Sequence, residues 1–173
     1  MDVLSEKWCK RHFRIAYEAA SWSKDPSSQV GSVIVDLNGR PRSYGFNGLP
    51  VGVRDDIPER NERPEKYNWY EHSERNALYL AQRSVEDCVM FTTHLPCPDC
   101  ARGIIQSGIK YVVVDSSNGF GSSFWERLQE AYRISTTMFH EKGVKYHEVE
   151  ADVTLVEIDG EKYVIPKMLQ NNL

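Results

Sequence analysis

Two short motifs in the middle of the chain constrain this sequence more than any other feature. The first is His72-Ser73-Glu74, and the second is Pro96-Cys97-Pro98-Asp99-Cys100. One imidazole and two thiols form a donor set that zinc prefers, and three protein ligands leave the fourth tetrahedral position to water, as in catalytic zinc sites. A carboxylate close to the histidine can serve that water as a general base. We therefore predict a zinc centre with His72, Cys97 and Cys100 as ligands and Glu74 as the acid/base group.

Both motifs are predicted to open helices. Proline suits the first turn of a helix, so Pro96 and Pro98 indicate a helix over 96–107 that starts near Cys97. Cys97 and Cys100 are three residues apart and would share one face of that helix. His72 and Glu74, two residues apart, can reach one pocket only from the very N-terminal end of the helix expected over 71–81.

Each motif alone has other interpretations. His-x-Glu occurs by chance in many proteins, and a lone Cys-x-x-Cys is also found in redox pairs and in half of a structural zinc site. The prolines here flank Cys97 rather than lie between the two cysteines, and the chain has no second Cys-x-x-Cys. The two motifs occurring together, each at the start of a helix, favour a catalytic zinc site.

Composition narrows the class of protein. The 173 residues suffice for one domain with a sizeable core. A net charge of −4 provides no basic field for a polynucleotide, so no nucleic-acid partner is expected. The chain shows no apolar signal segment at its start and no window long enough to span a membrane, which predicts a cytoplasmic protein with no membrane partner.

The hydrophobic pattern predicts an α/β fold in which strands alternate with helices. The expected strands cover 30–35, 42–46, 88–92, 109–115 and 144–149, with helices over 5–22, 71–81, 96–107 and 123–142. The segment 54–69 is charged and has no period, which predicts a long surface loop that acts as a lid or binding segment. A hairpin over 153–165 is expected to turn at Asp159-Gly160. We assign 1–150 to the main domain and 151–173 to a C-terminal extension of it.

Several motifs in register make residues 8–150 similar to one family. They are Ser23-Lys24-Asp25-Pro26-Ser27-Ser28-Gln29-Val30-Gly31, Gly45-Phe46-Asn47-Gly48-Leu49-Pro50, His72-Ser73-Glu74-Arg75-Asn76-Ala77, Pro96-Cys97-Pro98-Asp99-Cys100 and Gln106-Ser107-Gly108-Ile109-Lys110. The chain resembles the zinc-dependent cytidine and deoxycytidylate (dCMP) deaminases. This resemblance implies a cytidine-deaminase-like three-layer α/β/α fold with a five-stranded mixed sheet. It also implies hydrolysis of dCMP to dUMP and ammonia, which supplies dUMP for dTMP synthesis.

The resemblance extends to individual site residues. It implies that water on the Zn²⁺ held by His72, Cys97 and Cys100 attacks C4 of cytosine, with Glu74 as the proton shuttle. Asn47 matches the asparagine that contacts the sugar, although on its own it is equally typical of a turn. The 5′-phosphate region matches Lys24, Ser27 and Ser28, which by themselves indicate a solvated loop. Ser73 and Pro96 are expected beside the base.

Regulation and assembly are further implications of the resemblance. Family members are homo-oligomers, often hexamers, so a hexamer or dimer is expected. Many are activated by dCTP and inhibited by dTTP with Mg²⁺, and the matching effector positions are Gly48, Leu49, Gly52 and Asp55. The chain departs from the family at Ser73, where alanine is usual, which would alter tolerance for a 5-substituent. His94 beside the second motif contacts either the substrate or only the fold.

Three other functions compete with dCMP deamination. One is deamination of a 5-substituted dCMP, and another is deamination of a base in tRNA or single-stranded DNA, which needs a basic channel and stacking aromatics. The third is a silent regulator that binds nucleotides around a structural zinc. The net negative charge weighs against the polynucleotide, and Glu74 weighs against the silent regulator, because a structural zinc has no use for a proton shuttle.

Overall fold

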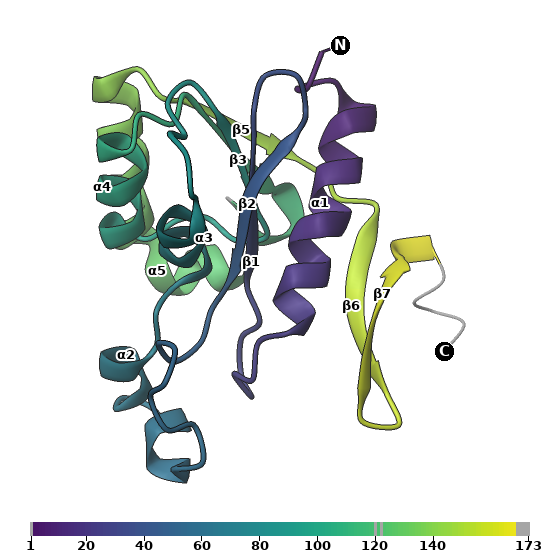
Figure 1. Ribbon diagram of the computed structural model, residues 1–173, viewed down its shortest axis with the longest axis vertical. Coiled ribbons are helices and arrows are strands. Elements are labelled where there is room, and N and C mark those ends of the chain that lie inside the picture. Colours follow the sequence, from purple (N-terminus) through teal and green to yellow (C-terminus); the bar gives the residue numbers. More distant parts are fainter. Residues whose placement is uncertain (1, 120, 122, 169–173) are drawn as a thin grey trace.

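The centre of the molecule is a five-stranded mixed sheet in the order β2-β1-β3-β4-β5 (Figure 1). Its strands are β1 Gly31–Val35, β2 Pro41–Phe46, β3 Val89–Thr92, β4 Tyr111–Asp115 and β5 Lys145–Val149. β1 is antiparallel to both β2 and β3, whereas β3, β4 and β5 are parallel. The computed structural model describes residues 2–119, 121 and 123–168. The predicted strands and their mixed sheet are confirmed.

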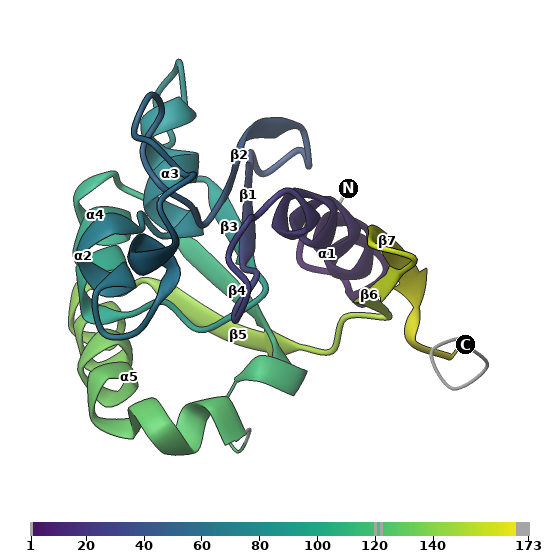
Figure 2. The same ribbon diagram turned by 90° about the horizontal axis from the view of Figure 1, so that it is seen from below.

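Alternation along the strands gives the sheet two apolar faces, because successive side chains point to opposite sides. On β3, Met90 belongs to the core under α3 (Ser73–Leu80), α4 (Pro98–Gln106) and α5 (Ser123–Lys142). Its neighbour Phe91 packs instead against α1 (Glu6–Ser21) on the opposite face. Figure 2 shows the three layers, with α1 on one side of the sheet and α3, α4 and α5 on the other.

Gly45 on β2 allows α3 to approach the sheet closely. A side chain at this position would lie within 2.3 Å of the Ser73 carbonyl oxygen and 2.4 Å of the Ala77 nitrogen. No Cβ atom fits at such distances, so only glycine permits this packing. The first turn of α3 is thereby held against the sheet, immediately after His72.

The segment 54–69 is more structured than the predicted loop. It contains the 3₁₀ helix η1 (Pro58–Asn61) and the short helix α2 (Lys66–Trp69). Lys66 in α2 is only 5% exposed, although the rest of the segment is largely at the surface. One inward-facing residue leaves no hydrophobic period in the sequence, which explains why the pattern predicted a loop.

Helix α5 bends near its start. Leu128 has φ −124° and ψ 18°, which lies outside helical values, and the axis changes direction there (Figure 2). Beyond the bend, Tyr132 and Phe139 are buried against the sheet. Among the described residues, no helix is both long enough and apolar enough to cross a membrane.

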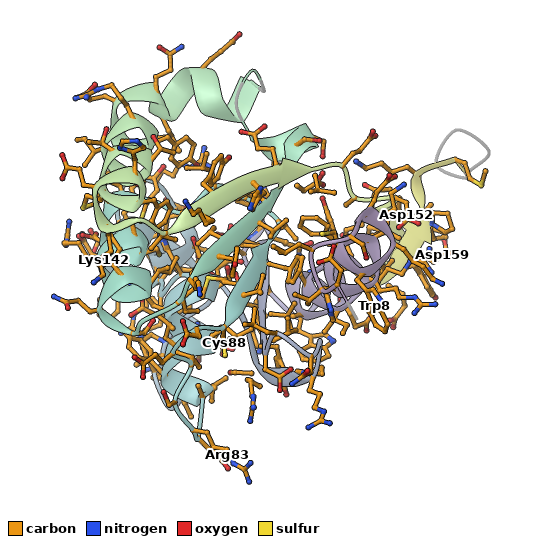
Figure 3. All side chains as sticks on the ribbon, turned by 90° about the horizontal axis from the view of Figure 1, so that it is seen from above. Trp8, Arg83, Cys88, Lys142, Asp152 and Asp159 are labelled. Carbon is orange, nitrogen blue, oxygen red and sulfur yellow. The ribbon has the colours of Figure 1, made fainter. Side chains whose placement is uncertain are left out.

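The C-terminal extension forms the predicted hairpin of β6 (Val153–Ile158) and β7 (Glu161–Pro166). Asp159 and Gly160 both have positive φ, 52° and 80°, as expected in a two-residue turn. The hairpin is a separate two-stranded sheet that packs outside α1 (Figure 1), where Arg14 pairs with Asp152 at 2.8 Å. In Figure 3, Asp152 and Asp159 mark this end of the molecule and Lys142, at the end of α5, marks the opposite end.

Candidate metal centre and active site

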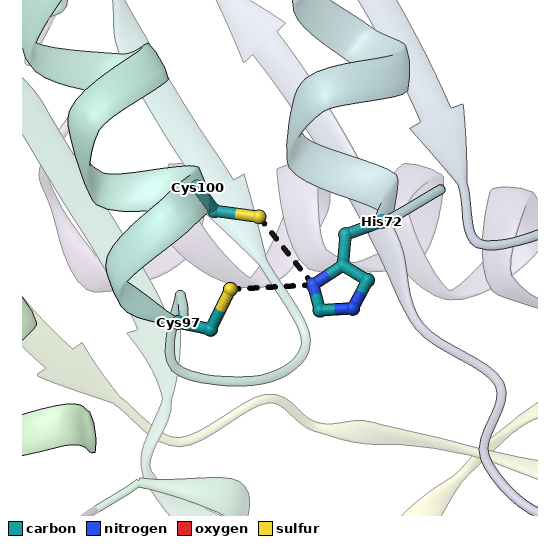
Figure 4. A group of neighbouring side chains, drawn as sticks. All are labelled: His72, Cys97 and Cys100. Carbon is teal, nitrogen blue, oxygen red and sulfur yellow. Dashed lines mark hydrogen bonds between the residues drawn. The ribbon is translucent and has the colours of Figure 1, made fainter. Parts of the chain in front are cut away.

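The ends of two helices bring one imidazole and two thiols together. His72 is the N-cap of α3, Cys97 is the N-cap of α4, and Cys100 lies in the first turn of α4. The His72 Nδ1 atom is 3.4 Å from the Cys97 sulfur and 3.5 Å from the Cys100 sulfur (Figure 4). All three candidate ligand atoms lie within 4.8 Å of one another. The prediction that His72 lies at the N-terminal end of this helix is confirmed.

This donor set fits zinc. One imidazole nitrogen and two cysteine sulfurs are ligands that zinc accepts in tetrahedral sites, and a set of three leaves one position for a reactant. His72 and Cys97 also line a cavity, so a metal held here would face the space that a substrate can enter. The grouping therefore has the form of a catalytic rather than a closed structural centre.

Hydrogen-bond contacts and charge couple the protonation of the three groups. A hydrogen bond from Cys100 and the nearby His72 imidazole lower the pKa of Cys97 to about 4. The same Cys97 sulfur raises the pKa of His72 to about 9, and the hydrogen bond with Cys97, together with burial, raises the pKa of Cys100. A thiolate is thus already favoured at Cys97, and metal binding would displace the remaining protons.

Glu74 lies in the first turn of α3 and is 3% exposed. Burial raises the pKa of its carboxyl group, because the charged form loses its hydration. The Ser73 hydroxyl donates a hydrogen bond to the Glu74 Oε2 atom at 3.0 Å and lies 2.7 Å from the Ser32 Oγ atom. Glu74 lines the same cavity as His72 and Cys97 and is therefore placed to exchange a proton with a bound molecule.

The cavity has a volume of about 440 Å³. Its polar lining residues are Asp25, Ser28, Asn47, Arg63, Lys66, His72, Ser73, Glu74, His94 and Cys97. Its apolar and aromatic lining residues are Val30, Tyr67, Tyr70, Leu95, Leu128, Ala131 and Tyr132. A space of this size with a few converging polar groups is typical of a small-molecule site.

A buried ion pair forms the second polar group of the cavity. The Lys66 Nζ atom lies 2.8 and 2.7 Å from the two Asp25 carboxylate oxygens and 2.6 Å from the Ser27 Oγ atom. Both side chains of the pair are almost fully buried, with 6% and 3% exposed. Burial alone would raise the pKa of Asp25, but the Lys66 ammonium and the Ser27 N–H outweigh it and lower that pKa.

Asn47 holds the loop that carries Asp25. Its Oδ1 atom accepts the Val30 N–H at 2.8 Å, and its Nδ2 atom donates to the Ser28 carbonyl at 2.8 Å and to Asp25 at 3.2 Å. The amide group of Asn47 is therefore engaged with the protein in this structure, while its side chain still lines the cavity.

Of the other predicted substrate residues, some lie at the cavity and some do not. Ser28 and Ser73 line the cavity, and Ser27 contacts Lys66. Lys24 points away from the cavity to Asp55, 2.5 Å from its carboxylate, and its side chain is 78% exposed. Pro96 is buried but does not belong to the described lining.

The predicted effector positions lie outside the cavity. Gly48 forms a two-way backbone pairing with Glu71, at 3.0 and 2.8 Å, just before His72. Val51, between Gly48 and Gly52, is fully exposed, and Asp55 pairs with Lys24. This loop therefore presents its tip to the surface.

Arg63 and Lys66 are the cavity cations that the sequence did not single out. Both come from the charged segment 54–69, where neither has a periodic apolar partner. The sequence signal that marks them is their place in the few residues before His72, next to Tyr67 and Tyr70. Arg63 is exposed and donates one long hydrogen bond, 3.4 Å, to Ser27.

His94 also lines the cavity, from the loop between β3 and α4. Its Nδ1 atom is 3.1 Å from the Thr93 hydroxyl, and burial lowers the pKa of the ring to about 4. The imidazole is therefore neutral near pH 7. Of the two roles considered from the sequence, the position of His94 favours contact with a bound molecule.

Fold and site together define a metal-dependent hydrolytic enzyme, in which two helix N-termini present ligands and a buried glutamate to one cavity. The model of the cytidine and deoxycytidylate deaminase zinc-binding region matches residues 6–116, and the chain belongs to this family. The match contains both ligand motifs and Glu74.

Individual relatives agree with this family. The chain is 45% identical to the protein named "Uncharacterized deaminase in luxG 3′region" of Aliivibrio fischeri, over 80% of this chain and 91% of that one. It is 33% identical to the deoxycytidylate deaminase of Mus musculus, over 84% and 85% of the two chains. The structure resembles that of the dCMP deaminase from cyanophage S-TIM5 in complex with dCMP and dUMP, with a TM-score of 0.59, 25% identity, and coverage of 84% and 96%.

Proposed function

We propose that this protein hydrolyses dCMP to dUMP and ammonia. The observation that carries the proposal is a single cavity that joins the His72–Cys97–Glu74 wall to the cationic group of Arg63 and Lys66. With the cytosine ring beside Glu74, the sugar and phosphate would lie near Arg63 and Lys66. The names of the mouse and cyanophage relatives support the choice of dCMP.

Zinc is the metal that His72, Cys97 and Cys100 would hold. When bound, it supplies Lewis acidity that lowers the pKa of a coordinated water. Glu74 accepts a proton from the attacking water and delivers it to the ring nitrogen N3. It then carries the second water proton to the amino group that leaves from C4 as ammonia. Water and dCMP are thereby converted to dUMP and ammonia with no other reactant.

Arg63 is the group proposed to bind the 5′-phosphate. The charge of Lys66 is already balanced by Asp25 at 2.7 Å, whereas within the described part of the chain Arg63 makes one long hydrogen bond, to Ser27. A guanidinium with free donors is suited to bidentate binding of phosphate oxygens. Ser27 and Ser28, on the loop beside it, would add hydroxyl and N–H contacts.

Regulation and assembly form a second part of the proposal. The exposed loop with Gly48, Leu49 and Gly52, together with Asp55, is proposed to bind dCTP or dTTP with Mg²⁺, and a homo-oligomer is expected. A free nucleotide substrate makes the cytoplasm the expected compartment. Light scattering of the purified protein, with and without each effector, tests assembly.

The decisive test is ammonia release by the zinc-loaded protein with dCMP, CMP, deoxycytidine, dCTP and 5-methyl-dCMP, each with and without dCTP/Mg²⁺ or dTTP/Mg²⁺. We expect preference for dCMP over deoxycytidine. An Arg63→Met variant should raise KM for dCMP by about tenfold or more and leave deoxycytidine unaffected, because a charge-assisted contact is lost. Arg83→Met is the matched control, because Arg83 is exposed at the edge of the molecule (Figure 3) and does not belong to the described lining of the cavity. If the protein released ammonia from none of these five nucleosides and nucleotides, the proposal would be overturned.

A further inference from the structure

The loop of residues Ser23–Val30 has two faces. Its inner face lines the substrate cavity with Asp25, Ser28 and Val30. Its outer face borders a second hollow of about 280 Å³, shared with the C-terminal hairpin. Lys162 of β7 and Glu157 of β6, which are paired across the hairpin, line this outer hollow. The hairpin therefore lies behind the loop that forms part of the substrate cavity.

One direct bond connects the hairpin to the loop. The Lys162 Nζ atom donates to the Ser23 carbonyl at 2.7 Å, and the Gln29 Nε2 atom donates to the same oxygen at 3.0 Å. Ser23 is 1% exposed, so this carbonyl is withdrawn from water. This oxygen therefore accepts one donor from the loop itself and one from the hairpin, which makes Lys162 a direct hydrogen-bonded link between the hairpin and the loop.

From Ser23 a chain of hydrogen bonds leads into the cavity. The Ser23 hydroxyl donates to the Asn47 carbonyl at 2.8 Å and accepts the Asp25 N–H at 3.2 Å. The Asn47 side chain in turn donates to Asp25, which binds Lys66. Lys162 itself is absent from the described lining of the cavity, so any effect on a bound molecule must pass through this chain.

The hairpin packs against α1 and the end of β4 without joining the five-stranded sheet. Its two strands pair with each other and form no ladder with the five-stranded sheet. The Arg14–Asp152 pair fixes its base to α1, and Lys167, just after β7, lies 3.8 Å from Asp115. The hairpin also lies beyond residues 6–116, the part matched by the family model. The hairpin is thus an addition to the part of the chain that the family model matches, and through Lys162 it contacts the loop of residues Ser23–Val30.

We propose that the hairpin is a brace for the substrate-binding loop, and that Lys162 is a positioning residue. By holding Ser23, it keeps Asp25, Asn47 and the Lys66 ammonium in the arrangement that receives the sugar-phosphate part of the substrate. This inference rests on the proposed function for its substrate, but the brace itself is a property of the loop. It predicts an effect on binding rather than on the chemical step, because Lys162 lies away from His72 and Glu74.

The test compares Lys162→Met and Lys162→Arg in the zinc-loaded full chain. Lys162→Met should raise KM for dCMP about tenfold while kcat changes less than twofold, because one hydrogen bond that orders the loop is lost. Deoxycytidine, which lacks the phosphate, should show a smaller rise. Lys162→Arg, which can still donate to the Ser23 carbonyl, should restore most of the affinity.

Hydrogen exchange provides a readout that does not depend on activity. In Lys162→Met, amide exchange should increase within residues 23–30 and remain unchanged in β3 and β4. The matched control is Lys167→Met, which removes another lysine contact of the extension, to Asp115, and should leave both KM and the exchange of the loop unchanged.

Three results would overturn the brace. They are unchanged exchange of the loop in Lys162→Met, an equal rise in KM in Lys167→Met, and a fall in kcat with no change in KM. If the wild type does not deaminate dCMP but Lys162→Met still loosens residues 23–30, the proposed function fails and the brace stands.

Discussion

The guanidinium of Arg75 links Cys100, a candidate metal ligand, with the Glu71 carboxylate. Its NH1 atom donates a hydrogen bond to the Cys100 sulfur at 3.6 Å, and its other nitrogens pair with the Glu71 carboxylate. Glu71 also accepts the His72 N–H at 3.0 Å. One arginine thus connects a candidate thiolate ligand with the residue that holds the candidate imidazole ligand.

We expect Arg75→Met to weaken zinc binding by about 10- to 100-fold, the usual effect of removing a partner of a metal ligand. The loss follows because the Cys100 sulfur and the Glu71 carboxylate would both lose their cation. Competition with a chromophoric chelator measures the affinity. Arg102→Met, in an exposed pair with Asp99 on α4, should leave zinc affinity unchanged. Equal affinities for wild type and Arg75→Met would contradict this role.

Glu74→Gln should retain one zinc per chain and lose about 100- to 10,000-fold in kcat, the range for loss of a general base. Glutamine keeps the size of the side chain but cannot accept the proton. Zinc content by elemental analysis and ammonia release with dCMP measure the two effects. Full activity in this variant would disprove the proposed proton transfer.

The buried Asp25–Lys66 pair predicts a strong coupling in stability. Lys66→Met alone should lower the free energy of unfolding by about 3 kcal/mol, because it leaves a buried carboxylate without its partner. Asp25→Asn alone should have a similar cost, and the double variant should cost much less than the sum of the two. Urea unfolding of the wild type, the two single variants and the double variant measures this double-mutant cycle. Additive losses would show that the two charges are not coupled.

His12 predicts an acid-dependent loss of stability. It is 2% exposed between the rings of Trp8 and Phe91, and neither ring nitrogen has a hydrogen-bond partner among the described residues. Burial lowers the pKa of His12 below its ordinary value, so the unfolded chain takes up the proton first as the pH falls.

The contribution of neutral His12 is therefore present above about pH 6.5 and is lost as the pH falls from there towards the lowered pKa of the folded state. The limit is about 1.4 kcal/mol per pH unit. His12→Phe, which preserves the ring packing, should lack this part of the pH dependence. Urea unfolding of both proteins between pH 5 and 8 measures the difference. Parallel curves would show that His12 does not titrate in this way.

Local sequence was sufficient for most of the helices and strands and for the two ligand motifs, but not for η1 and α2 in the segment 54–69. The short apolar, β-branched runs of β1, β3 and β4 and the Asp159-Gly160 turn are properties of short segments, and the structure confirms these elements. His72 and Cys97 each lie at a helix N-cap, because the proline and polar residues around them stop one element and start the next. Each motif therefore contains most of the information that brings its ligands to a helix end.

The rest of the cavity was decided by tertiary structure. Lys24 and Lys66 have the same charge and both lie in polar segments. Lys66 nevertheless forms a buried ion pair with Asp25, whereas Lys24 forms an exposed ion pair with Asp55. No local pattern distinguishes them, because the pairing of Lys66 joins positions 41 residues apart in the chain. The Lys162–Ser23 contact joins positions 139 residues apart. Spacing within a segment determines which side chains share a helix end or a strand face, whereas contacts between distant segments depend on how the finished layers pack.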